Sequence, residues 1–237
     1  MNTLSILLPL LIILAFAGLL LLAIRTSRKQ IAEKTHQASN LGFEEVISRP
    51  TQLISRVEDL YKRGKHQGIQ VDQVYSKKDW DQEFFIFDVS SSNQDDNELG
   101  SEVFGVISNH LSLPHFSITT LPGFDSSSLL GGLMDGLLDK VLAFSEGYLG
   151  MTRIEFPERP EIDDQLIVFG KDEAAVRELI DRINLSSITR MKTYLHIAGM
   201  DDFLTVDFSQ MTAYSSTDSD LIAQYREFIH ILDNFNK

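Results

Sequence analysis

The longest uniform stretch of apolar positions lies at the start of the chain. Residues 4–24 form a run of 21 residues without an ionisable side chain. As a helix this run covers about 30 Å, the thickness of the hydrocarbon layer of a bilayer. The pattern predicts a membrane-spanning helix. No proline or glycine interrupts residues 25–40, so the helix is expected to continue as a stalk and to end where Asn40 and Gly42 provide a C-cap.

The next stretch changes from a helical period to an alternating one. A helix is predicted to open at 48–51, with Leu53, Ile54, Val57, Leu60 and Tyr61 on one face. From Ile69 apolar and polar residues alternate, Trp80 lies in a polar turn, and residues 84–89 form an apolar strand. Further strands are predicted at 103–107 and 116–120. Because the four strands have short links, the pattern predicts an antiparallel meander.

A glycine-containing stretch with leucines at helical spacing follows at 129–142. It includes Leu133 and Leu137 and predicts an amphipathic helix, which either packs on the core or docks a partner. After it the pattern predicts strands at 166–169, 194–197 and 203–208. Helices are expected at 176–183 and from 217 onward. The predicted fold class is α+β, with one transmembrane helix followed by a soluble domain of a mainly antiparallel sheet and packed helices. The expected division is an anchor at 1–24, a basic stalk at 25–47 and the soluble domain at 48–237.

The positive charges near the apolar run predict its direction. Arg25, Arg28, Lys29 and Lys34 follow the run, and no lysine or arginine precedes it. The positive-inside rule therefore predicts a single-pass protein of the inner membrane, with its N-terminus outside and its C-terminal domain in the cytoplasm. A cleaved signal peptide is the alternative, but the run exceeds the usual 7 to 15 residues and no small-residue cleavage site follows.

Charge and composition narrow the classes of function. Residues 25–78 hold 11 basic and 6 acidic residues, a net charge of +5, whereas residues 79–237 hold 10 basic and 28 acidic residues, a net charge of −18. So acidic a domain is repelled by phosphate backbones, which argues against nucleic-acid binding. The chain has no cysteine, so disulfides, thiolate nucleophiles and cysteine-containing zinc sites are excluded.

A few residues are candidates for chemistry. Asp88 ends an apolar strand, where burial could make its carboxyl a proton donor or a binding group; the alternative is that it faces water. His110 and His115 flank a proline turn and could face one metal, but no third ligand has a defined spacing, which favours two surface histidines. The loop at 93–97 resembles the start of a calcium loop but lacks its glycine and its final glutamate. No phosphate-binding, serine-hydrolase or zinc-protease motif is present, and no cofactor is predicted.

Short motifs spread over the chain carry a resemblance. They are Gly42-Phe43, Phe87-Asp88 at the end of a strand, Leu-Pro-x-Phe at 113–116 and Gly-x-Asp-Glu at 170–173. In this order, after a basic-flanked apolar run, they resemble uncharacterised bacterial single-pass membrane proteins. The resemblance implies no activity.

The sequence predicts a well-patterned fold but contains no set of residues that is competent for a reaction. We therefore predict a non-catalytic function. We expect a membrane-anchored scaffold, adaptor or assembly component that contacts the bilayer through residues 4–24 and acts through a protein partner or self-association. The alternative is a membrane-tethered hydrolase or small-ligand sensor that uses carboxylates such as Asp88.

Overall fold

The computed structural model describes residues 4–48, 50–60, 69–91, 101–120, 150–189, 195–208 and 220–236. Within these ranges, the side chains at 4–17, 20, 23, 91 and 101 lie outside the description. The chain divides into two compact units, Met1–Gly42 and Phe43–Lys237. The predicted helix at 129–142, with Leu133 and Leu137, lies outside the described residues, as does the calcium-like loop at 93–97.

The first unit is the helix α1, Leu4–Asn40. Its end agrees with the sequence prediction, because the helix stops at Asn40 and Gly42 follows with φ 83°, a left-handed conformation that glycine adopts readily.

The prediction of a membrane span is corrected. Among the described residues, no helix combines the length and the apolar composition needed to cross a membrane. The side chains described in α1 include the charged residues Arg25, Arg28, Lys29, Glu33 and Lys34. Charged side chains are costly in hydrocarbon. This finding contradicts the predicted transmembrane helix, the single-pass architecture and the inner-membrane location with its stated orientation.

The second unit is built on a nine-stranded antiparallel sheet, and the α+β class is as predicted. Its strands are β1 (Glu44–Glu45), β2 (Ile69–Asp79), β3 (Gln82–Ser91), β4 (Ser101–Ser108), β5 (Leu113–Thr120), β6 (Thr152–Ile154), β7 (Leu166–Gly170), β8 (His196–Asp201) and β9 (Phe203–Asp207). The order across the sheet is β1-β2-β3-β4-β9-β8-β5-β7-β6. All neighbours are antiparallel.

The predicted four-strand meander is only partly correct. β2, β3 and β4 pair in sequence, but β4 then pairs with β9 and β5 pairs with β8, so the β8–β9 hairpin lies between β4 and β5. β8 begins at His196 rather than at 194. The sequence pattern specifies which face of a strand is apolar but not which neighbour it pairs with, and this is why the inserted hairpin was missed.

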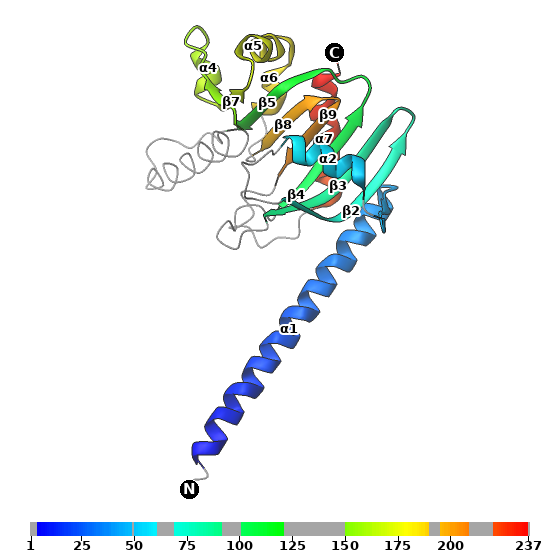
Figure 1. The fold of residues 1–237 in the computed structure, drawn as a ribbon, viewed down its shortest axis with the longest axis vertical. Helices are drawn as coiled ribbons and strands as arrows, with labels where there is room; N and C mark the ends of the chain where they lie inside the picture. The colour runs from blue at the N-terminus through cyan, green and yellow to red at the C-terminus, as the bar shows by residue number, and fades with distance from the viewer. Residues whose placement is uncertain are drawn as a thin grey trace. The chain divides into compact units, whose positions relative to one another are not determined.

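Helix α2 (Thr51–Leu60) covers part of one face of the sheet (Figure 1). Its residues Leu53, Val57 and Leu60 are buried, as the helical spacing predicts. They join a core cluster with apolar side chains from that face of the sheet, among them Phe85, Phe87, Val103, Phe169, Ala198 and Phe203. At about 25 cal/mol per Å² of buried apolar surface, this packing supplies most of the stability of the helix.

Helix α7 (Leu221–Phe235) lies on the opposite face, behind the sheet in Figure 1. Asp220 caps its start by accepting hydrogen bonds from the backbone N–H groups of Ile222 and Ala223. The contact with the sheet is aromatic: the ring of Phe228 stacks on Phe104 at 5.7 Å and meets Phe84 edge-on at 6.3 Å. The sheet is therefore covered by helices on both faces.

Three shorter helices lie beyond β5, at the top of Figure 1: α4 (Pro160–Asp163), α5 (Glu173–Arg182) and α6 (Leu185–Thr189). Asp172 caps α5 by accepting a hydrogen bond from the N–H of Ala175. Val176, Leu179 and Ile180 are buried on the face that the sequence pattern indicates.

Candidate functional site

Three tight turns lie at one end of the sheet, which we call the turn end: residues 79–82 between β2 and β3, residues 108–113 between β4 and β5, and residues 201–203 between β8 and β9. Hydrogen bonds link the turns. The side-chain amide of Gln82 donates to the hydroxyl of Ser108 at 3.1 Å, and the N–H of Ser108 donates to the carbonyl of Asp202 at 2.9 Å. The three turns therefore form one continuous surface.

Ion pairs add to these links. His110 Nε2 lies 2.5 Å from the carboxylate of Asp81, which joins the first turn to the second. Arg56 on α2 donates to Asp202 at 2.9 Å, which joins the third turn to the helix. Both pairs are partly exposed, so each contributes on the order of 1 kcal/mol or less. Their main effect is to fix the shape of the turn end.

Trp80 is the most unusual residue of this surface. It occupies the first position of the two-residue turn between β2 and β3, and its side chain is 100% exposed. Its backbone has φ 55°, in the left-handed region that glycine, asparagine and aspartate favour. An aromatic residue in this region costs about 1 kcal/mol or more. Trp80 is therefore a large, fully exposed apolar residue in a backbone conformation that is unfavourable for it.

The β8–β9 turn provides an internal reference for Trp80. Met200 pairs with Phe203, so Asp201 occupies the same first position of a two-residue turn. Its φ is 56°, almost identical to that of Trp80. Aspartate tolerates this conformation, because its short polar side chain can bond to the local backbone. The geometry of the turn therefore does not require an aromatic residue.

A second group of polar residues is buried in the sheet, toward the opposite end. Ser117, His196 and Asp207 come from the neighbouring strands β5, β8 and β9 and are at most 5% exposed. A hydrogen bond of 2.8 Å joins Ser117 Oγ to His196 Nε2, and His196 is the register partner of Asp207. Thr119 and Thr205 are buried on the same strands. We call Ser117, His196 and Asp207 the buried polar group.

Burial sets the charge state of this group. It lowers the pKa of His196 below its usual value, because desolvation disfavours the imidazolium; the charge of Asp207 acts in the opposite direction. His196 is therefore a neutral imidazole at pH 7. A neutral histidine beside a serine and an aspartate has the composition of a hydrolytic triad.

The surroundings of Ser117 argue against catalysis. Its side chain is 0% exposed, and it lies in mid-strand opposite Phe169 in β7 and Ala198 in β8, so its backbone belongs to the sheet ladder. A nucleophilic serine needs access for a substrate and free N–H donors for the oxyanion. We therefore interpret the buried polar group as a structural network that satisfies polar groups inside the sheet.

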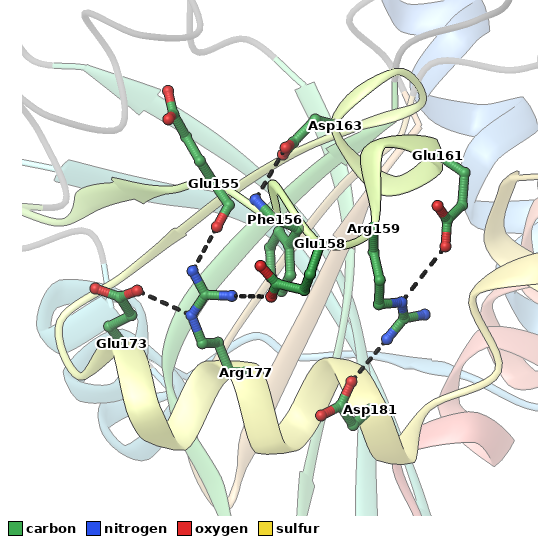
Figure 2. Close-up of polar contacts among 9 residues, drawn as sticks. All are labelled: Glu155, Phe156, Glu158, Arg159, Glu161, Asp163, Glu173, Arg177 and Asp181. Atoms are coloured by element: carbon green, nitrogen blue, oxygen red, sulfur yellow. Dashed lines mark hydrogen bonds and ion pairs between the residues drawn. The ribbon is translucent and has the colours of Figure 1, made fainter.

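A charged cluster on the surface joins α5 to residues 155–161, which lie between β6 and β7 (Figure 2). Arg177 donates to Glu173 at 2.8 Å, to Glu158 at 2.7 Å and to the carbonyl of Glu155 at 2.5 Å. Its guanidinium also lies 4.8 Å from the ring centre of Phe156, within range of a cation–π contact. These carboxylates raise the pKa of Arg177, mainly through the Glu173 hydrogen bond.

The neighbouring arginine repeats this arrangement: Arg159 pairs with Asp181 at 2.7 Å and with Glu161 at 3.5 Å. Residues 155–161, between β6 and β7, are thus held against α5 by two arginines whose described ion pairs and hydrogen bonds lie within this segment and α5. The cluster therefore stabilises the packing of α5 against this segment, and it is not a free binding surface.

The structure separates the residues that the sequence singled out. Asp88 is half-buried in β3, where its register partners are Asp72 and Glu102. Among the described residues, no group of three or more histidines, aspartates or glutamates could hold a metal ion.

The two candidate histidines do not face one another as a pair of ligands. His110 is exposed beside Asp81, whereas His115 is buried and its Nε2 donates to the carbonyl of Leu60 at 3.2 Å. Burial, reinforced by the charge of Lys171, lowers the pKa of His115. The expectation of two surface histidines thus fits His110 only. Arg25, Arg28 and Lys29 are exposed on α1, and Lys34 is half-exposed.

Comparisons with known proteins add little to this picture. No family model matches the chain, and no curated protein matches it. One solved structure is similar, the crystal structure of the mycobacterial trehalose monomycolate transport factor A, TtfA, with 14% identity and a TM-score of 0.47 over 88% of this chain and 93% of that chain. A likeness at this level carries no argument about function. The resemblance to uncharacterised bacterial membrane proteins is not tested by these comparisons.

Proposed function

We propose that the unit Phe43–Lys237 is a binding domain that contacts a partner protein through the turn end of its sheet. The observation that carries the proposal is Trp80, a fully exposed aromatic residue in a left-handed backbone conformation. Strained residues of this kind persist where a function needs them. Tryptophan is also enriched among the residues that carry most of the binding energy of protein interfaces.

The fixed shape of the surroundings supports the same proposal. The Gln82–Ser108 hydrogen bond and the Asp81–His110 pair hold the base of the hairpin, so Trp80 is presented on a preformed surface. Preformed surfaces bind with a smaller loss of conformational entropy. The alternative of a hydrolase or ligand sensor has less support, because Asp88 is not part of a metal-binding cluster among the described residues and Ser117 is inaccessible.

The test is site-specific photo-crosslinking with the full chain. A photoreactive amino acid replaces Lys78, whose side chain is 77% exposed next to the turn. We expect a discrete crosslinked species of constant stoichiometry in cells, and we expect Trp80→Asn to abolish it. Asparagine suits the left-handed conformation, so this variant remains folded.

Two control variants separate binding from other effects. Ile47→Asn removes another exposed apolar side chain, 98% exposed, outside the turn end, and Asp164→Asn changes an exposed aspartate at the C-cap of α4. Both should retain the crosslinked species. Equal crosslinking in the Trp80→Asn background would refute the proposal.

A further inference from the structure

We infer that the partner presents a basic segment, and that an arginine or lysine of this segment stacks on the indole of Trp80 between acidic side chains. This inference rests on the proposed function and names the chemistry of the partner. The first argument is the composition of the turn end. Its two hairpin turns carry Asp79, Asp81, Asp201 and Asp202.

These carboxylates exceed the positive charge near them. Asp81 pairs with His110 and Asp202 pairs with Arg56. The nearby Lys78 lies 3.8 Å from Glu83, across the hairpin. The whole chain carries a net charge of −13, so the long-range field also attracts a cation toward this surface.

The second argument is the kind of aromatic residue. The face of an indole attracts cations more strongly than the ring of phenylalanine or tyrosine does. Trp80 has both neighbours in sequence acidic, Asp79 and Asp81. An aromatic face flanked by carboxylates complements a guanidinium, which stacks on the ring and bonds to the carboxylate at its edge.

The structure itself contains this type of contact elsewhere. The guanidinium of Arg177 lies 4.8 Å from the ring centre of Phe156 and bonds to Glu158 and Glu173. Lys77 Nζ likewise lies 5.6 Å from the ring of Tyr225. In both cases this chain supplies the cation. At Trp80 the ring is fully exposed, so a cation for it would come from another molecule.

Trp80 is also a built-in reporter, because it is the only tryptophan of the chain. We would titrate the full chain with hexa-arginine, hexalysine and hexaglutamate and follow tryptophan emission. Fluorescein-labelled peptides would provide binding constants by anisotropy. We expect hexa-arginine to change the emission and to bind more tightly than hexalysine, and hexaglutamate to leave the emission unchanged. Binding should weaken with added salt.

Variants distinguish this site from general attraction to an acidic protein. We expect the double variant Asp79→Asn/Asp81→Asn to bind hexa-arginine at least fivefold more weakly, and Trp80→Asn to lose a similar factor or more. The matched control is Asp164→Asn/Glu178→Gln, which removes the same charge from exposed positions on the C-cap of α4 and on α5. It should bind like the unmodified chain.

Each other outcome has a definite meaning. Equal weakening in the control and in the Asp79/Asp81 variant, or unchanged binding by Trp80→Asn, would overturn the inference. A change of tryptophan emission on dilution without peptide would also overturn the inference, because it would indicate that a second copy of this chain covers Trp80. Crosslinking that depends on Trp80, combined with no preference for hexa-arginine over hexaglutamate, would overturn the basic partner and leave the binding domain standing. Loss of the Trp80 dependence in crosslinking would remove both.

Discussion

The two ends of the sheet use polar residues in opposite ways. At the turn end Asp79, Asp81 and Trp80 are exposed, and the local ion pairs are partly solvated. In the buried polar group, Ser117, His196 and Asp207 are removed from water, and Ser117 is hydrogen-bonded to His196 inside the sheet. Polar side chains of the first kind are available to a partner, whereas those of the second kind determine stability. In this domain, the exposure of a polar side chain, more than its residue type, distinguishes a side chain available to a partner from one that contributes to stability.

The largest expected effect concerns Asp207. Replacing it by alanine opens a cavity beside His196 and removes a polar partner from inside the sheet, and we expect a loss of about 3 kcal/mol in the free energy of unfolding. The matched change at the turn end, Asp79→Ala, should cost less than about 0.5 kcal/mol. Urea unfolding of both variants measures the difference. Similar losses in the two would erase the contrast between the two ends.

The second effect is a dependence of stability on pH. Burial lowers the pKa of His196 in the folded state, so below the unfolded value of about 6.5 the unfolded chain binds more protons. The contribution of His196 is present above this pH and is lost as the pH falls, by at most about 1.4 kcal/mol for each pH unit. Buried His115 acts in the same direction.

Denaturant unfolding between pH 7.5 and pH 5 tests this effect. His196→Gln should flatten the curve below pH 6.5, and the exposed His230→Gln should not. An unchanged slope in His196→Gln would assign the acid sensitivity to other groups.

A smaller effect is expected at Ser117. Alanine there leaves His196 Nε2 without its 2.8 Å partner, and we expect a loss of about 1–2 kcal/mol. If Ser117→Ala were instead neutral in stability but removed a measurable esterase activity, the group would be catalytic and our structural interpretation would be wrong.

The smallest effect has the opposite sign. Trp80→Asn relieves the left-handed strain and should stabilise the domain by up to about 1 kcal/mol, while Asp201→Asn stays within about 0.5 kcal/mol of the original. Thermal unfolding of the two variants measures this. Destabilisation by Trp80→Asn would mean that the indole supports the fold, and its exposure would then have no functional meaning.

The sequence predicted the local structure better than the contacts between distant segments. The apolar faces of α2 and α5 follow from helical spacing, and the turn around Trp80 follows from polar residues between two alternating strands. The pairing of β4 with β9 does not follow, because nearly 100 residues separate these strands and pairing is decided by the assembled sheet.

The same limit applies to the two sites. Ser117 and His196 are 79 residues apart in sequence, so no motif joins them. Trp80 was recognised as a turn residue only. The available signal was a tryptophan between two aspartates in a short turn, a position where glycine or asparagine is usual.

The insertion of the β8–β9 hairpin between β4 and β5 also has a consequence for synthesis of the chain. β4 and β5 leave the ribosome more than 75 residues before the hairpin that joins them. Until residues 196–207 arrive, each of the two strands has an unpaired edge, which is a template for pairing with another chain. The nascent domain therefore depends on its last strands for protection, and chains truncated before His196 should aggregate rather than fold.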